Sequence, residues 1–153
     1  MITYQEEKFS KVVFESYPLI EAHHREVDPM RDVAPLKLDM ETYLTMEKAG
    51  HIVLCTARRD KGLVGYHLNF INQSHHSKNT TYAINDVVYV VPELRGGTVP
   101  VRLFQFAEEK IRERGVRVIT TTMIPGHGYE KLLDFLGYKE MEVTYSKVIR
   151  RDS

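Results

Sequence analysis

The stretch from Val90 to Lys110, "VVPELRGGTVPVRLFQFAEEK", is the part of the sequence best suited to binding an anion. It runs from apolar residues through Pro, Arg and two Gly into an amphipathic segment, the pattern of a strand, a tight loop and a helix. The first N–H groups of a helix have no partner inside it and can hold a phosphate. Pro100 lies in the expected first turn and has no N–H. Three interpretations follow: a phosphate-binding loop, a weakened one, or a turn.

The loop does not match the common phosphate-binding motifs, because no Gly-Lys-Ser/Thr follows it and it lacks GxGxxG. Metal chemistry is not expected either. The pairs His23-His24 and His75-His76 have no zinc-type spacing, and adjacent histidines in a strand point to opposite faces. Cys55 lies within an apolar run, so we expect a buried thiol and not a nucleophile.

Hydrophobic periodicity predicts the elements before the loop. Apolar residues at helical spacing predict a helix from about residue 4 to 26, either kinked at Pro18 or restarting there with Ser16 as N-cap. A connector rich in Pro and Asp covers residues 28–39, and a short helix then ends at Gly50. Strands are expected at 51–59 and 63–74, joined by the turn "DKG", and at 82–91. The third strand is nearly all apolar, so we expect it to be buried on both faces.

After the loop, the pattern predicts a helix that ends at Gly115, a strand at 116–124 and a helix at 125–137. A last strand with period-two alternation is expected at 138–149. The strand–helix–strand unit over 82–124 must be a right-handed parallel crossover. The prediction is a mixed sheet with helices on both faces, in one domain over residues 1–153, with ligands beyond the carboxyl ends of the strands.

Composition excludes several classes of function. Lys+Arg and Asp+Glu both number 21, so the net charge of zero argues against nucleic acid or an anionic membrane as the main partner. No apolar run approaches the roughly 18 residues of a membrane span. A single cysteine permits no intrachain disulfide, so the expected location is the cytoplasm.

In its order of elements, the sequence resembles the GCN5-related N-acetyltransferase (GNAT) family. The usual loop of that family, Arg/Gln-x-x-Gly-x-Gly/Ala, follows a strand ending in V-x-P; here "VVPE" precedes "LRGG". The family also closes with a helix ending in "LGF" or "LGY" and a last strand, as in "YEKLLDFLGYKEMEVTYSK". The resemblance covers residues 17–149 and is greatest to short acetyltransferase-like proteins of tailed bacteriophages. It implies an α/β (α+β) fold with a mixed, mainly antiparallel sheet and one parallel crossover at the loop.

The resemblance implies acetyl-CoA as cosubstrate and a primary amine, on a small molecule or a protein, as acceptor. Backbone N–H groups of the loop would hold the pyrophosphate, and Val90 and Val91 would pair with the pantetheine arm, one of their N–H groups polarising the thioester. Direct attack of the amine on the acetyl carbonyl would follow. The residues implied in cosubstrate binding are Val90, Val91, Arg95, Gly96, Gly97, Thr98, Val99 and Arg102.

Two departures from the family pattern bear on catalysis. With Arg95 at the first motif position, the later glycines fall on Thr98 and Pro100, which removes one N–H. The tyrosine that often reprotonates the thiolate in the family, four residues before the "LG" glycine, is Leu133 here. The candidates for a replacement acid or base are Asp86, Tyr129 and His127, and Glu93 is a weaker candidate. Their structural alternatives are a hydrogen-bonded carboxylate for Asp86, core packing for Tyr129, and exposed or capping loop positions for His127 and Glu93.

Three functions therefore remain open. The first is an N-acetyltransferase in the cytoplasm, the host cytoplasm for a phage-encoded chain. The second is a GNAT fold without catalysis, a binding or structural module that is virion-associated or host-directed. The third is a sensor of CoA or another nucleotide. For assembly, the alternatives are a homodimer, formed by pairing of the last strands, and a complex with another protein.

Overall fold

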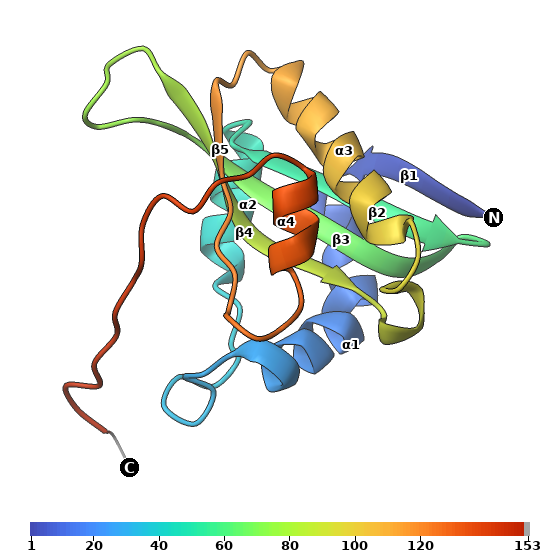
Figure 1. The fold of residues 1–153 in the computed structure, drawn as a ribbon, viewed down its shortest axis with the longest axis horizontal. Helices are drawn as coiled ribbons and strands as arrows, with labels where there is room; N and C mark the ends of the chain where they lie inside the picture. Colours follow the sequence, from blue (N-terminus) through green and yellow to red (C-terminus); the bar gives the residue numbers. More distant parts are fainter. Residues whose placement is uncertain (152–153) are drawn as a thin grey trace.

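A computed structural model describes residues 1–151 of the chain (Figure 1). Five strands form one sheet in the order β1-β2-β3-β4-β5. The strands β1 (Ile2–Glu7), β2 (Ile52–Arg59), β3 (Gly62–Gln73) and β4 (Thr81–Val90) are antiparallel neighbours. The short β5 (Val118–Thr120) runs parallel to β4. The prediction of a mixed, mainly antiparallel sheet with one parallel crossover is confirmed.

Helices cover both faces of the sheet, as predicted. On one face lie α1 (Phe9–Val27) and α2 (Met40–Lys48), and α3 (Val99–Arg112) packs on the other. A short 3-10 helix, η1 (Pro92–Leu94), precedes the glycine loop, and α4 (Glu130–Phe135) follows β5. No helix within residues 1–151 is both long and apolar enough to cross a membrane.

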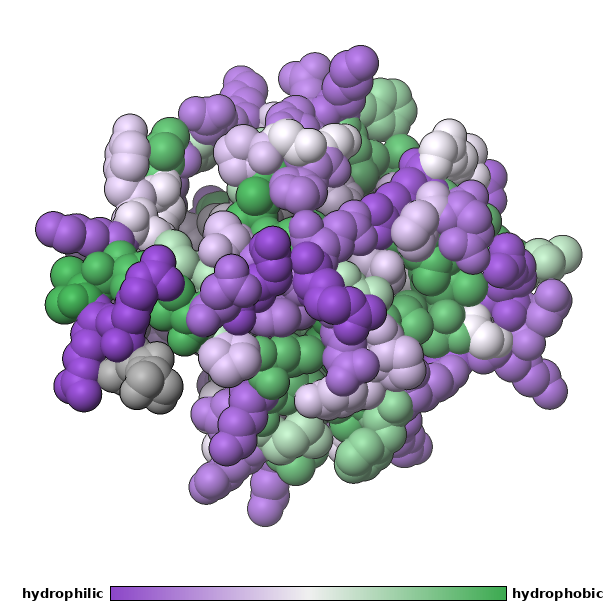
Figure 2. All heavy atoms as spheres, turned by 90° about the horizontal axis from the view of Figure 1, so that it is seen from below, coloured by the Kyte–Doolittle hydropathy of each residue, from purple (hydrophilic) through white to green (hydrophobic). Residues whose placement is uncertain are grey.

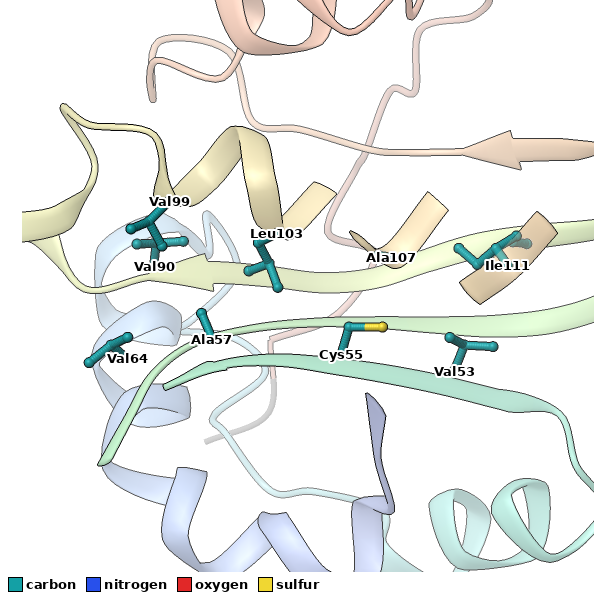
Figure 3. Close-up of a cluster of buried hydrophobic side chains, with 10 residues drawn as sticks. Val53, Cys55, Ala57, Val64, Val90, Val99, Leu103, Ala107 and Ile111 are labelled. Carbon is teal, nitrogen blue, oxygen red and sulfur yellow. The ribbon is translucent and has the colours of Figure 1, made fainter. Parts of the chain in front are cut away.

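The core between the sheet and α3 follows from helical spacing. Leu103, Ala107 and Ile111 repeat every four residues on α3 and are fully buried against β2, where Cys55 is also fully buried (Figure 3). The expectation of a buried thiol is confirmed, and burial raises the Cys55 pKa to about 12. At Gly65 the backbone packs so closely that a Cβ atom would lie 3.0 Å from the carbonyl oxygen of Tyr89. Only glycine fits this approach of β3 to β4.

The opposite core joins α1 and α2 to the same strands. Phe9, Val12 and Val13 of α1 are buried against Leu54, Tyr66, Leu68 and Tyr89 of the sheet. Leu38 and Tyr43, from the connector and α2, pack at the edge of this cluster. This second layer places α1 and α2 beside β4, where the candidate site lies.

The first strand corrects the predicted helix from residue 4. Residues 2–7 pair with β2, Tyr4 opposite Ala57, and the partly buried Ile2 and Tyr4 alternate with exposed neighbours. The helix begins at Phe9 and continues through Pro18 without a restart. Ser16 is not an N-cap, because its hydroxyl donates to the carbonyl oxygen of Val13 at 2.8 Å.

The expectation that residues 82–91 are buried on both faces was also wrong. Consecutive buried residues occur in β2 and β3, whereas Ile84 and Asp86 of β4 are exposed. The reason is position: β2 and β3 lie in the middle of the sheet, while β4 has only the three-residue β5 beyond it.

The C-terminal part departs most from the prediction. Both β5 and α4 are shorter than expected, and the segment 138–149 pairs with no strand within residues 1–151. Its alternating pattern is real, but the apolar residues of that pattern face solvent: Met141, Val143, Tyr145 and Ile149 are all exposed. Figure 1 shows this segment projecting from the body of the molecule.

Candidate active site

A β-bulge places Asp86. In the β3–β4 register, Leu68 pairs with Val87 and Asn69 with Asn85, so Asp86 is the extra residue. The amide nitrogen of Asn85 donates to the carbonyl oxygens of Leu68 (3.1 Å) and Val87 (3.2 Å), which gives partners to carbonyls at the irregularity. The bulge turns Asp86 towards α2.

The bulge also marks where β4 and β5 part. Parallel pairing ends with Ile84 opposite Thr120, two residues before Asp86. Beyond that point a cavity of about 400 Å³ is lined by β4 on one side and by residues 121–124 on the other. The ends of α1 and α4 and the connector complete it. Its lining includes Ile20, His23, His24, Val27, Asp28, Leu36, Leu38, Tyr43, Asp86, Val87, Val88, Thr121, Met123, His127, Tyr129 and Leu133.

The carboxylate of Asp86 accepts a hydrogen bond from the Tyr43 hydroxyl at 2.5 Å. Asp86 is reached by solvent through the cavity, but protein surrounds its other sides, and this desolvation raises its pKa. The hydrogen bond from Tyr43 acts in the opposite direction. Burial and the neighbouring carboxylate raise the pKa of Tyr43, which therefore remains the proton donor of the pair. Asp86 is thus a carboxylate with heightened affinity for a proton, as a general base requires.

The structure brings the three predicted catalytic residues, Asp86, His127 and Tyr129, to one cavity. Burial raises the pKa of Tyr129. The N–H of Leu133 donates to the carbonyl oxygen of Tyr129 at 2.9 Å, so the two residues are one helical turn apart. Both residues line the cavity. The Tyr129 phenol therefore lies one helical turn before Leu133, the position at which the GNAT family often has its tyrosine. Glu93 lies elsewhere, with its carboxylate 3.7 Å from Arg59.

The glycine loop presents free N–H donors. Within residues 1–151, the N–H groups of Gly96 and Gly97 donate to no acceptor. Both residues are exposed, neither has a positive φ, and a Cβ on either would meet no atom within 4 Å. The protein's own packing therefore does not require glycine here. Thr98 precedes α3 without a side-chain cap, Val99 is its first residue, and the buried Pro100 has no N–H to offer.

Arg95 connects the loop to its surroundings. Its Nε–H donates to the carbonyl oxygen of Val90 at 2.7 Å, and its two terminal nitrogens contact the Glu26 carboxylate at 2.5 and 3.0 Å. The guanidinium also lies 5.1 Å from the centre of the Tyr89 ring. Arg95 thus joins β4 to α1, and Glu26 balances its charge.

Two other expected cosubstrate contacts also have partners in the chain. The N–H of Val91 donates to the carbonyl oxygen of Val64 at 2.9 Å, so it belongs to the sheet. Arg102 is exposed on α3, and its charge acts on the phenol of Tyr4 in β1. Val88, which the sequence reasoning did not select, lines the cavity. Because N–H and C=O directions alternate along a strand, Val88 and Val90 share an edge of β4, a relation that strand periodicity could have supplied.

Sequence reasoning missed three further residues that shape the site: Tyr43, Asn85 and Glu26. An Asn beside Asp86 in an otherwise apolar strand was the available signal for the bulge. Nothing local identifies Tyr43 or Glu26, which reach the site from other elements. Within residues 1–151, no group of three or more His, Cys, Asp or Glu is placed to hold a metal ion.

Comparison with known proteins places this geometry in a fold class. No protein-family model matches the sequence, and no curated protein matches it. Solved structures match over nearly the whole chain. The ribosomal-protein-alanine N-acetyltransferase of Brucella melitensis biovar Abortus 2308 is 16% identical with a TM-score of 0.69, covering 99% of this chain and 100% of its own.

Two further structures match equally broadly. Glucosamine-6-phosphate N-acetyltransferase from Arabidopsis thaliana is 10% identical with a TM-score of 0.72, covering 98% of this chain and 99% of its own. A predicted acetyltransferase from Clostridium acetobutylicum, solved with acetyl-CoA, is 11% identical with a TM-score of 0.71 and 97% coverage of both chains. The chain therefore has the GNAT fold, as the sequence resemblance implied.

Proposed function

We propose that the protein is an acetyl-CoA-dependent N-acyltransferase that acetylates a primary amine. The observation that carries the proposal is the cavity at the β4 bulge, where Asp86, His127 and Tyr129 meet. Arg95, the residue before the two loop glycines, is near enough to this cavity for its charge to lower the pKa of the Tyr129 phenol against the effect of burial. A candidate proton acceptor and candidate proton donors therefore share one cavity, and free backbone N–H groups lie in the loop that follows Arg95.

In this proposal the cosubstrate supplies an activated acetyl group as a thioester. Its pyrophosphate fits the loop, because the free N–H groups of Gly96 and Gly97 lie before the positive end of α3. Val99 adds a further N–H, the Thr98 hydroxyl offsets part of the loss at Pro100, and Arg102 adds positive charge. Arg95 is paired with Glu26, so in this proposal it holds the loop in position and does not contact the pyrophosphate.

The pantetheine arm would run between β4 and residues 121–124. Strand directions make the outward-facing backbone groups of Val88 and Val90 the partners for this arm. The carbonyl of Val90 already accepts from Arg95, which leaves its N–H as the group available on that residue. An N–H at this point of β4 lies where the acetyl carbonyl must be polarised.

Asp86 is the proposed general base. An alkylamine is mostly protonated at neutral pH and must lose a proton before it attacks. A carboxylate whose pKa is raised by desolvation accepts that proton more readily than one in water. Tyr129 is the proposed acid, because its phenol lies one turn before Leu133 and borders the same cavity. His127, beside it, is the alternative donor.

The acceptor end of the cavity favours an amine on an apolar body. Ile20, Val27, Leu36 and Leu38 line it from α1 and the connector. Its other carboxylate, Asp28, is already 3.1 Å from the imidazole of His24. Asp86 can form an ion pair with one ammonium group. A compound with several positive charges would have few other carboxylates in the cavity to pair with. The proposed acceptors are therefore apolar primary amines, free or on a protein.

Binding of acetyl-CoA is tested first, and turnover is measured second. Acetyl-CoA at about 100 times its dissociation constant should stabilise the fold by about 2.7 kcal/mol, which thermal unfolding detects. Gly97→Asp should abolish this stabilisation while leaving the free protein folded, because the new side chain has room but repels phosphate. Gln105→Glu, an equal change of charge at an exposed position of α3, is the matched control.

Release of CoA thiol over a panel of amines then measures catalysis, with Cys55 contributing little background because it is buried. Absence of stabilisation at millimolar acetyl-CoA would reject the proposal. Binding without turnover would instead favour the second function, a GNAT-fold module that is virion-associated or host-directed. Leu133 and Pro100 are the features in favour of that module, since both remove groups that the family uses.

A further inference from the structure

We propose that the acceptor is a free amine with a short alkyl chain, and that this chain enters a second cavity beside Asp86; this rests on the function proposed above. The second cavity (the inner cavity) has a volume of about 50 Å³ and lies between α1 and the sheet. Its lining includes Val12, Val13 and Ser16 of α1 and Leu54, Tyr66 and Leu68 of the sheet.

The inner cavity meets the larger one at Asp86. Both cavities are lined by Ile20, Leu38, Tyr43, Asp86 and Val87. An ammonium group paired with Asp86 therefore has the larger cavity on one side and the inner cavity on the other. The thioester needs the larger cavity, which leaves the inner cavity for the chain of the amine. Ile20 and Leu38, which belong to the apolar acceptor end, lead from one cavity to the other.

The inner cavity suits hydrocarbon, because its polar side chains already have partners. The Ser16 hydroxyl donates to a backbone carbonyl of α1, and the Tyr66 hydroxyl lies 3.4 Å from Nδ1 of His23. Tyr43 donates to Oδ2 of Asp86, while Oδ1 of Asp86 accepts from no group in the described part of the chain and can meet an ammonium. A buried water needs two to four polar partners, so an apolar cavity of this kind stays dry and favours an alkyl chain.

The size of the inner cavity limits the chain. About 10–15 Å³ of space is needed for each group the size of a water molecule, so the cavity accommodates about four methyl or methylene groups. Val12, Leu54 and Leu68 of its walls are buried core residues, and a close-packed core does not widen without strain. An amine on a protein would have to bring its polypeptide into this closed space. The inner cavity therefore selects a free amine with a chain of about four carbons.

The amine reaches the inner cavity from the larger one. On the other side α1 closes it, with Val12, Val13 and Ser16 buried under the helix and Glu15 and Glu21 exposed on its outer face. Figure 2 looks onto the side of the molecule where α1 lies and shows hydrophilic side chains across the middle of the view. An alkyl chain therefore enters past Asp86, which places its ammonium group at the carboxylate.

The first experiment measures kcat/KM with acetyl-CoA for the series of straight-chain amines from methylamine to hexylamine. Each methylene that enters the inner cavity should raise kcat/KM about fourfold, which corresponds to about 0.8 kcal/mol. The rise should end at about four carbons, where the cavity is full. A series without this rise, or a lysine peptide that is acetylated better than butylamine, would overturn the inference.

The second experiment changes the volume of the inner cavity. Ser16→Leu fills it and should lower the ratio of kcat/KM for butylamine to that for methylamine by about 10–20-fold, as expected for two methylenes shut out. Val13→Ala enlarges it and should move the best substrate to a longer amine. Ser10→Leu, at an exposed position of α1, is the matched control and should keep the wild-type ratio. A ratio that Ser16→Leu leaves unchanged, in a variant shown to be folded by thermal unfolding, would contradict the inference.

Binding of butylamine to the protein without acetyl-CoA separates this inference from the proposed reaction. Methyl NMR signals of Val13 and Leu68 should shift, because both line the inner cavity. Val27 and Leu36 line the larger cavity but not the inner one, so shifts confined to them, or no shifts, would reject the inference. Absence of turnover with every amine would reject the proposed reaction, whereas shifts at Val13 and Leu68 would still assign the alkyl chain to the inner cavity.

Discussion

At the scale of single residues, Asp86 shows how surroundings set the chemistry of a side chain. A carboxylate in a strand usually faces water, but the bulge turns this one into a cavity where burial raises its pKa. Tyr43 opposes the shift with a hydrogen bond from α2. Burial raises the pKa of Asp86 and the hydrogen bond lowers it, so removing the Tyr43 hydroxyl leaves the effect of burial alone.

We expect Tyr43→Phe to raise the pKa of Asp86 further, because the charged carboxylate loses a hydrogen bond. A base works in its deprotonated form, so the acid limb of kcat/KM against pH should move to higher pH. The ring stays packed, since Phe9 stacks on Tyr43 at 4.7 Å without using the hydroxyl. The measurement is the pH–rate profile, with Tyr17→Phe, on the exposed side of α1, as control.

Asp86→Asn completes the test of this residue. Loss of the proposed base should reduce turnover by roughly 10²–10⁴-fold and remove the acid limb altogether. An acid limb that persists in Asp86→Asn, or one that does not move in Tyr43→Phe, would assign the proton transfer to another group.

At the scale of elements, the sequence predicted most of the fold through periodicity and turn residues. The turn "DKG" is an example, since Asp60 and Lys61 adopt the positive φ values that a tight hairpin needs. The first strand escaped prediction because "ITYQEE" is short and Gln and Glu favour helices, so its alternation was outweighed. Only the pairing of β1 with β2, a contact distant in sequence, decides the outcome.

The candidate site also has a part that the sequence predicts and a part that depends on contacts distant in sequence. The cavity wall residues Asp86 and Tyr129 and the glycine loop follow from local pattern and from the family resemblance. The partners of these groups, Tyr43 for Asp86 and Glu26 for Arg95, lie 43 and 69 residues away in sequence. No local signal carries such contacts, because they depend on how α1 and α2 pack over the sheet.

The bulge itself can be tested through Asn85. Asn85→Ala would leave the carbonyls of Leu68 and Val87 without that donor in a buried setting, which costs about 1–3 kcal/mol for each group left without a partner. We expect a loss of about 2–4 kcal/mol in the free energy of unfolding, measured in urea. Asn72→Ala, at the exposed end of β3, should change it by less than about 0.5 kcal/mol. An equally small effect at Asn85 would show that the bulge does not need its amide.

At the scale of the whole molecule, the two helical layers enclose a sheet that contains a buried histidine. His67 lies in β3 on the α3 side, with its ring centre 4.7 Å from that of Phe104. Its Nδ1 accepts from the Asn69 amide at 2.8 Å, and its Nε2 is buried without a partner within residues 1–151. Folding therefore requires the neutral imidazole, and desolvation lowers the pKa of His67 to about 4.

This burial predicts how the stability of the fold depends on pH. In the unfolded chain a histidine takes up a proton near pH 6.5, whereas His67 in the folded protein does so only near pH 4. Between these values only the unfolded state gains the proton, so stability falls as pH decreases. The loss is about 1.4 kcal/mol per pH unit, or about 3 kcal/mol over the window.

Urea unfolding at fixed protein concentration from pH 7 to pH 4 measures this loss, and His67→Gln isolates it. The variant should be less stable at pH 7, where the wild-type imidazole is neutral in both states, but its stability should fall by about 3 kcal/mol less on acidification. The comparison removes contributions shared by both proteins, including that of His23, whose pKa burial also lowers. His76→Gln, in an exposed loop, should keep the full wild-type slope. Parallel slopes in wild type and His67→Gln would mean that the folded core admits the charged imidazole.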